Sequence, residues 1–179
     1  MSHHQQLNYI KEVKDQFRSS FLNSRVLEIG SLDINGSIRQ FFENCEYIGL
    51  DVGPGPGVDI VCEGQLFNDP DNSFDVTISC ECFEHNPFWL ETFKNMVRLC
   101  KPGGLVVFTC ATTGRKEHGT SRTTPLDSPL TVKKGWDYYR NLEESDFTSE
   151  LNLKSLFKDF KFSSSLSSKD LYFWGIKHD

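Results

Sequence analysis

The part of the chain that most constrains its fold is residues 25–51, RVLEIGSLDINGSIRQFFENCEYIGLD. It begins with a short, mostly apolar run that ends at Gly30, as in a parallel strand covered on both faces. A second such run, residues 47–50, ends at Asp51. We therefore expect a strand, a tight turn, a short helix near residues 38–42 and a second strand.

The end of the second expected strand indicates what the chain binds. In open α/β sheets, ligands bind beyond the carboxyl ends of the strands, and an acidic residue there can hold two ribose hydroxyls. Asp51 has that position. A dinucleotide site would carry the glycine pattern GxGxxG, whereas here Gly30 is followed by SLDIN before Gly36, and Asp33 would repel a pyrophosphate. The stretch therefore favours a nucleoside cofactor that is cationic near the turn, and it argues against NAD.

At these residues the chain resembles the class I S-adenosylmethionine-dependent methyltransferases. Four motifs carry the resemblance, in order: VLEIG at 26–30, YIGLD at 47–51, FDVTIS at 74–79 followed by Glu84 and His85, and KPGG at 101–104. The second glycine usual in the first motif is missing. The resemblance implies an α/β fold, a Rossmann-like three-layer sandwich with a mostly parallel seven-stranded sheet and an antiparallel C-terminal hairpin strand.

The resemblance also implies S-adenosyl-L-methionine as cofactor. Asp51 would bind the ribose, and the first turn would hold the methionine end. Glu63 and Gly64 are candidates for adenine contacts, with a solvated loop carboxylate as the alternative for Glu63. Glu81 would contact the methionine part or line the substrate pocket. The full expected set of cofactor-binding residues is Glu28, Gly30, Ser31, Asn35, Asp51, Val52, Glu63, Gly64 and Glu81.

Two histidines are candidate catalytic residues. His85 follows the strand that ends beside the reactive methyl group in this architecture, and histidine is the side chain whose ordinary pKa lies nearest neutrality. The alternative is that Glu84 and His85 only brace their loop. His118 is the second candidate base. An amine acceptor, once neutral, would need neither.

The remaining chain predicts a single domain over residues 1–179, with an amphipathic N-terminal helix in residues 1–23. Residues 112–141 show no regular period but interleave cations and aromatic rings, which suits a substrate loop or lid for a polar acceptor; a solvated loop is the alternative. The other expected elements are strands at 58–61, 74–79 and 105–110, helices at 89–100 and 144–157, and a hairpin of 160–166 with 171–176.

Composition excludes several functions. A net charge of −6 disfavours nonspecific nucleic-acid binding, and no apolar stretch approaches the roughly 20 residues of a membrane span. The six cysteines are expected to be free thiols in a cytoplasmic protein. The spacing of Cys80 and Cys82 is weak as a metal signal, and no metal ligands are assigned.

These features predict an S-adenosylmethionine-dependent methyltransferase acting on a small or extended polar acceptor, by O- or N-methylation, with small molecules and glycan-like compounds such as sugars as candidates. One alternative is a noncatalytic nucleoside-binding module that senses the cofactor or binds a partner. Another is an NAD-linked oxidoreductase.

Overall fold

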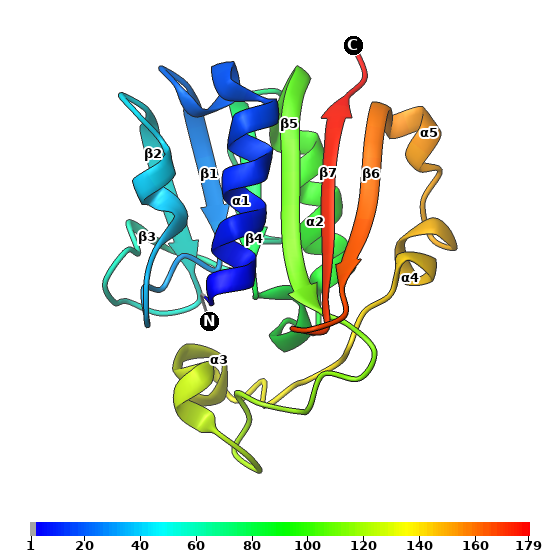
Figure 1. Ribbon diagram of the computed structural model, residues 1–179. Helices are drawn as coiled ribbons and strands as arrows, with labels where there is room; N and C mark the ends of the chain where they lie inside the picture. The colour runs from blue at the N-terminus through cyan, green and yellow to red at the C-terminus, as the bar shows by residue number, and fades with distance from the viewer. Residues whose placement is uncertain (1–2) are drawn as a thin grey trace.

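A single mixed sheet forms the centre of the computed structural model, which describes residues 3–179 (Figure 1). Its parallel strands are β1 (Arg25–Ile29), β2 (Glu46–Asp51), β3 (Ile60–Val61), β4 (Phe74–Cys80) and β5 (Cys100–Ala111). The C-terminal strands β6 (Phe157–Ser165) and β7 (Asp170–Lys177) pair antiparallel. The strand order is β3-β2-β1-β4-β5-β7-β6, with β7 antiparallel to β5. The expected fold is confirmed.

One long helix covers each face of the sheet (Figure 1). On one face, α1 (His4–Gln16) buries Ile10 and Val13 against alternate residues of β1, β4 and β5. On the other, α2 (Trp89–Leu99) buries Phe93 and Met96 against the remaining set. Because successive strand residues point to opposite faces, central strands with nearly continuous apolar runs supply both layers. These two packed layers fix the carboxyl ends of the parallel strands.

Phenylalanine rings fill the layer between α2 and the sheet. Phe108 on β5 is fully buried and stacks on Phe147 and Phe173 with ring centroids 4.6 and 5.1 Å away. Phe93 of α2 meets the same rings edge-on. Offset stacks and edge-to-face pairs are the favourable aromatic arrangements. The phenylalanine rings therefore pack α2, α4 (Glu144–Thr148) and the C-terminal strand β7 together on this face of the sheet.

Two expected elements near the first strands are shorter than the sequence indicated. The helix expected near residues 38–42 is a single turn of 3-10 helix, η2 (Ile38–Phe41). Asn44, with φ of +53°, turns the chain directly into β2. The strand expected at 58–61 reduces to β3. Before it, the Asp59 amide still donates to the Gly49 carbonyl at 2.8 Å, but the Gly49 amide donates to the Asp59 side chain at 2.7 Å and not to a backbone carbonyl.

Two further elements differ in extent. The fifth strand begins at Cys100, not at 105, because the KPGG segment forms a bulge opposite Phe74 and Val76, with Gly103 at φ of +71°. The helix expected over 144–157 is two short helices, α4 (Glu144–Thr148) and α5 (Leu153–Leu156). Asn152, at φ −80° and ψ 83°, leaves the helical region between them.

The N-terminal helix ends at Gln16, and one 3-10 turn, η1 (Arg18–Phe21), continues it. All six cysteines are free thiols, as predicted. Within residues 3–179, no helix has both the length and the apolar character needed to cross a membrane.

Candidate functional site

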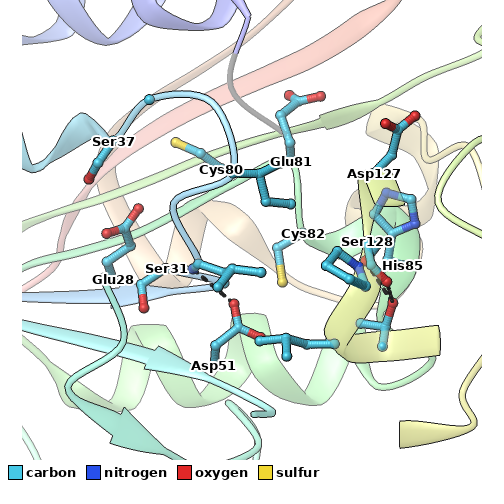
Figure 2. Close-up of a pocket in the computed structure, with 17 residues that line it drawn as sticks. Glu28, Ser31, Ser37, Asp51, Cys80, Glu81, Cys82, His85, Asp127 and Ser128 are labelled. Carbon is cyan, nitrogen blue, oxygen red and sulfur yellow. Dashed lines mark hydrogen bonds between the residues drawn. The ribbon is translucent and has the colours of Figure 1, made fainter. Parts of the chain in front are cut away.

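A pocket lies at the carboxyl ends of β1, β2 and β4, where the sheet's topology places ligands (Figure 2). Three parts of the chain form it: the turn after β1, the ends of β2 and β4, and a segment far away in sequence. Its lining residues are Glu28, Gly30, Ser31, Leu32, Ile34, Gly36, Ser37, Asp51, Cys80, Glu81, Cys82, His85 and the segment 127–131.

The turn after β1 is held tightly against β2 and β4. The amides of Gly30 and Ser31 both donate to the Leu50 carbonyl, at 2.9 and 3.0 Å. Gly30 has φ of +83°, and a Cβ there would lie 2.6 Å from the Cys82 Cβ. Only glycine suits both the conformation and the approach. The Ser31 hydroxyl is buried and has no hydrogen-bond partner within the described chain.

Asp51 at the end of β2 points into the pocket (Figure 2). Its Oδ2 accepts from the Leu32 amide at 3.0 Å and its Oδ1 from the Val52 amide at 2.7 Å. These bonds fix the carboxylate, although each oxygen can accept a second donor. Burial raises the pKa of Asp51, and the two amide bonds oppose that rise. A fixed carboxylate in this position can receive hydroxyl groups from a ligand.

Glu28 on β1 is a second buried carboxylate of the pocket. Its Oε2 accepts from the Tyr47 hydroxyl at 2.8 Å. Burial raises the pKa of Glu28 to about 7, against the hydrogen bond from Tyr47 and the charge of Arg39. The group therefore changes charge near neutral pH, and a bound cation would favour its ionised form.

Glu81, directly after β4, links the pocket to the N-terminus. Its backbone has φ of +51°, a conformation that non-glycine residues rarely adopt. Its Oε1 accepts from the Thr109 hydroxyl at 2.9 Å, and its Oε2 lies 3.5 Å from His3 Nε2. Asp170 lies 3.1 Å from the same His3 nitrogen. Burial alone would lower the His3 pKa, but the nearby carboxylates of Asp170 and Glu81 outweigh it and raise the pKa to about 9.

The two histidines predicted from the sequence lie together. The rings of His85 and His118 are 5.0 Å apart and perpendicular, and Tyr139 lies 5.6 and 5.0 Å from them. Burial, and then the charge of His118, lower the pKa of His85 to about 3. The neighbouring Glu84 is fully buried, and burial raises its pKa to about 8. This group of residues borders the pocket through His85.

Residues 112–141 cross the mouth of the pocket. Within them, η4 (Pro125–Asp127) and α3 (Pro129–Lys134) lie beyond the carboxyl ends of the strands (Figure 1). Leu130 approaches so closely that a Cβ on Gly53 would lie 2.9 Å from it. Lys134 forms a 2.7 Å ion pair with Glu63. This segment therefore contacts both the pocket and the loops that follow β2 and β3.

The structure brings six of the predicted site residues to the pocket lining: Glu28, Gly30, Ser31, Asp51, Glu81 and His85. The other predicted residues lie outside the lining. The Val52 amide supports Asp51, and Glu63 pairs with Lys134. Gly64 packs against the core, since a Cβ there would be 2.7 Å from the Ile29 Cγ2. Asn35 is exposed in the turn, between the lining residues Ile34 and Gly36. His118 contacts His85.

The sequence analysis missed some of the lining. Cys80 and Cys82 are predicted from the sequence only as free thiols with a weak metal signal, yet both face the pocket beside Glu81 (Figure 2). Their place at the end of a strand was the signal that could have identified them. The segment 127–131 carries a Ser-Pro helix start, Ser128-Pro129, but nothing local in sequence indicates which surface that helix covers.

Comparisons with known proteins agree with this architecture. The sequence profile described as "Methyltransferase domain" matches residues 1–164. No curated protein matches the chain in a sequence search.

Among solved structures, the chain is similar to Haemonchus contortus phosphoethanolamine N-methyltransferase 2 in complex with phosphomonomethylethanolamine and S-adenosylhomocysteine. The TM-score is 0.64 at 17% identity, over 96% of this chain and 53% of that one. It is also similar to the YcgJ protein of Bacillus subtilis, with TM-score 0.64 and 12% identity over 99% and 100% of the two chains.

A third similar structure is the Burkholderia thailandensis 1,6-didemethyltoxoflavin-N1-methyltransferase with bound 1,6-didemethyltoxoflavin and S-adenosylhomocysteine. Its TM-score is 0.60 at 12% identity, over 100% of this chain and 93% of that one. The present chain spans about half the length of the Haemonchus enzyme but nearly all of the other two.

The sheet order and the pocket at its carboxyl edge define the class of protein: an α/β domain with the Rossmann-like methyltransferase fold. The profile match covers more than half of the chain, and the chain therefore belongs to the methyltransferase domain family. The resemblance seen in the sequence is confirmed.

Proposed function

We propose that this protein is an S-adenosylmethionine-dependent methyltransferase acting on a small polar acceptor. The observation that carries the proposal is the position of Asp51: in a member of this family, its fixed carboxylate lies in the same pocket as the Gly30 turn. When bound, the cofactor supplies an activated methyl group on a sulfonium. The similar structures from Haemonchus and Burkholderia hold S-adenosylhomocysteine, which supports the choice of cofactor.

The residues present fit this cofactor. Asp51 would accept the two ribose hydroxyls, and Glu28 would attract the cationic methionine end. The unpartnered Ser31 hydroxyl and the glycine turn would bind the methionine carboxylate or amine. Glu81 would lie at the boundary between cofactor and acceptor. Holding the acceptor in line with the methyl group would then supply most of the catalysis.

The segment 112–141 would act as the lid of this site. Residues 127–131 already line the pocket. Several cations of this segment are paired within the protein, as in the ion pairs of Arg115 with Asp170, Arg122 with Asp137, Lys134 with Glu63 and Arg140 with Asp146. We therefore favour an acceptor that is recognised by hydroxyl and ring contacts over one held by its negative charge.

Proton removal from a hydroxyl acceptor would fall to the group around His85 and His118. A pKa of about 3 makes the His85 imidazole a weak proton acceptor on its own, so it needs a partner for that role. A neutral amine acceptor would need no base. A cytoplasmic location also stays a prediction.

Cofactor binding should strengthen as the pH rises through 7. Below its pKa of about 7 Glu28 is neutral, and above it the carboxylate attracts the cofactor's cationic end. Only about a tenth of Glu28 is ionised at pH 6, so we expect affinity about 10-fold weaker at pH 6 than at pH 8. The charged or titratable neighbours that share this environment are Asp33, Arg39, Tyr47, Asp51 and Cys80.

Isothermal titration of S-adenosylhomocysteine at several pH values checks this expectation. The Glu28→Gln variant is the matched control, since the ligand's own titration is the same for both proteins. The difference between the two pH profiles should be centred near pH 7. Parallel profiles would show that Glu28 does not face the ligand's cationic end.

Transfer of a labelled methyl group tests the proposed activity. Purified protein is incubated with methyl-labelled S-adenosylmethionine and a panel of hydroxylated and amine-bearing small molecules. Label should appear in at least one acceptor, together with S-adenosylhomocysteine. Tight cofactor binding without transfer to any acceptor would favour the alternative, a noncatalytic sensor or partner-binding module.

A further inference from the structure

Three side chains form a group beside the pocket, and within the described residues the polar side-chain atoms of its two buried members have no hydrogen-bond partner. The third member, His118, is half-buried, and its Nδ1 lies 3.0 Å from the Lys116 carbonyl oxygen. Glu84 and His85 come from the 3-10 turn η3 (Phe83–His85) that follows β4, and His118 comes from the segment 112–141. Glu84 is fully buried and His85 is 2% exposed. Within residues 3–179, neither carboxylate oxygen of Glu84 and neither ring nitrogen of His85 has a hydrogen-bond partner.

The spacing of these groups suits a shared ion better than direct contact. One ligand atom from each of the three residues lies within 4.8 Å of the other two. Ligands placed about 2.1 Å from a metal ion lie roughly 3 to 4 Å apart. A small inward movement of His118, which sits on a loop, would complete that geometry. A carboxyl group buried without a hydrogen-bond partner is costly in either protonation state, and a cation among the three groups would stabilise its ionised form.

We propose that Glu84, His85 and His118 bind a divalent transition-metal ion at the acceptor end of the pocket. Two imidazoles and one carboxylate form a donor set that suits ions such as Zn²⁺, Co²⁺, Mn²⁺ and Fe²⁺. Neutral imidazole is the form that ligates a metal. Three protein ligands leave coordination positions open for water or an acceptor atom.

A second acidic group in the same region has no comparable need for an ion. His3, Glu81 and Asp170 also lie within 4.8 Å of one another. However, His3 lies between the two carboxylates, at 3.1 Å from Asp170 and 3.5 Å from Glu81. Arg115 donates to the other Asp170 oxygen at 2.8 Å. Internal cations therefore compensate that group, whereas nothing within the described chain does the same for Glu84.

The ion would take part in the proposed methyl transfer, and its catalytic role therefore rests on the proposed function. A hydroxyl oxygen of the acceptor would replace a metal-bound water, and the ion would lower the pKa of that hydroxyl. The proton passes to solvent. The resulting oxygen anion forms a bond to the methyl carbon while the carbon–sulfur bond breaks and sulfur keeps the electron pair. The metal would thus promote loss of the hydroxyl proton, a role for which the His85 imidazole alone is a weak base.

Direct metal titration tests the site without relying on activity. The full chain, purified without a histidine tag and stripped with a chelator, is titrated with Zn²⁺ by calorimetry and with Co²⁺ by visible absorption. We expect one ion per chain and Co²⁺ bands typical of nitrogen and oxygen ligands. Glu84→Gln and His118→Ala should each weaken metal binding by about 100-fold or more. That loss exceeds the one expected for residues that only hydrogen-bond to a metal ligand.

Two variants serve as controls. His178→Ala removes an exposed histidine far from the group and should leave metal affinity unchanged. Asp170→Asn disrupts the group around His3, and it too should leave metal affinity unchanged. Thermal unfolding of each variant separates lost ligation from lost structure, and His118 is the more tolerant position because it is only half-buried.

Three results would overturn the proposal: no stoichiometric binding, affinity unaffected by Glu84→Gln and His118→Ala, or affinity lost in Asp170→Asn but kept in His118→Ala. Titration of the stripped protein with S-adenosylhomocysteine distinguishes this failure from failure of the proposed function. Cofactor binding without metal binding would overturn the metal-site proposal and leave the proposed function standing. Absence of cofactor binding would remove the methyltransferase proposal and leave the metal titration to be judged separately.

Discussion

Replacing Asp51 by alanine is expected to weaken S-adenosylhomocysteine binding by about 1 to 3 kcal/mol through lost charge-assisted hydrogen bonds, which is about 5- to 150-fold in Kd. In the structure the carboxylate is fixed by the amides of Leu32 and Val52 while it lines the pocket. The proposed ribose contacts would therefore be preorganised. Isothermal titration calorimetry measures the loss.

The same substitution frees two backbone amides, so stability has to be measured alongside affinity. Asp159→Ala, which removes an exposed carboxylate on β6, is the matched control and should change neither quantity. Titrations are run at a temperature where thermal unfolding shows both variants to be folded. Wild-type affinity in a folded Asp51→Ala protein would place the ribose elsewhere.

Replacing Phe108 by alanine should lower the free energy of unfolding by about 3 to 5 kcal/mol. Phe108 is fully buried on β5 and stacks on both Phe147 and Phe173. The substitution removes those contacts and leaves a cavity at the junction of α2, α4 and the C-terminal hairpin. Urea denaturation followed by circular dichroism gives the change.

The matched comparison is Phe88→Ala, the same chemical change at a side chain that is 42% exposed. Its ring meets only Trp136 of the lid among the aromatic residues described, so its effect should stay below about 1 kcal/mol. Equal losses at the two positions would mean that the buried aromatic layer contributes no more to stability than an exposed ring does.

The fold could be predicted from the sequence because its strands carry strong local signals. The run 26–30 and the run 47–51 are each short and mostly apolar, and each ends at a residue with a clear role, Gly30 or Asp51. Alternation with helices then requires a parallel sheet. Element ends were less predictable: Asp59 replaces part of the β3 ladder through its side chain, and that contact with Gly49 is not visible in a linear pattern.

The candidate site was only partly predictable, because contacts between segments far apart in the chain leave no local pattern. Residues at strand ends, such as Glu28, Asp51 and Glu81, reach the pocket because topology brings strand ends together. Contacts made by the segment 112–141 depend on tertiary packing and have no period to reveal them. No local pattern indicates that Leu130 lies against Gly53.

The proposed metal site shows the same limit of local patterns. The sequence pattern predicts no metal ligands, because the spacing of Cys80 and Cys82 is weak as a metal signal. The structure instead places His118 beside the adjacent pair Glu84 and His85, although the helix α2, the strand β5 and part of a loop separate them in the chain. Burial also matters, because the same side chains exposed at the surface would hydrogen-bond to water and would need no ion.

The most direct measurement of the central claim is a pair of calorimetric titrations of the purified chain, one with S-adenosylhomocysteine and one with NAD. We predict saturable, stoichiometric binding of S-adenosylhomocysteine and no binding of NAD, because the turn between Gly30 and Gly36 lacks the dinucleotide glycines and carries Asp33. Saturable binding of NAD with no response to S-adenosylhomocysteine would contradict the account.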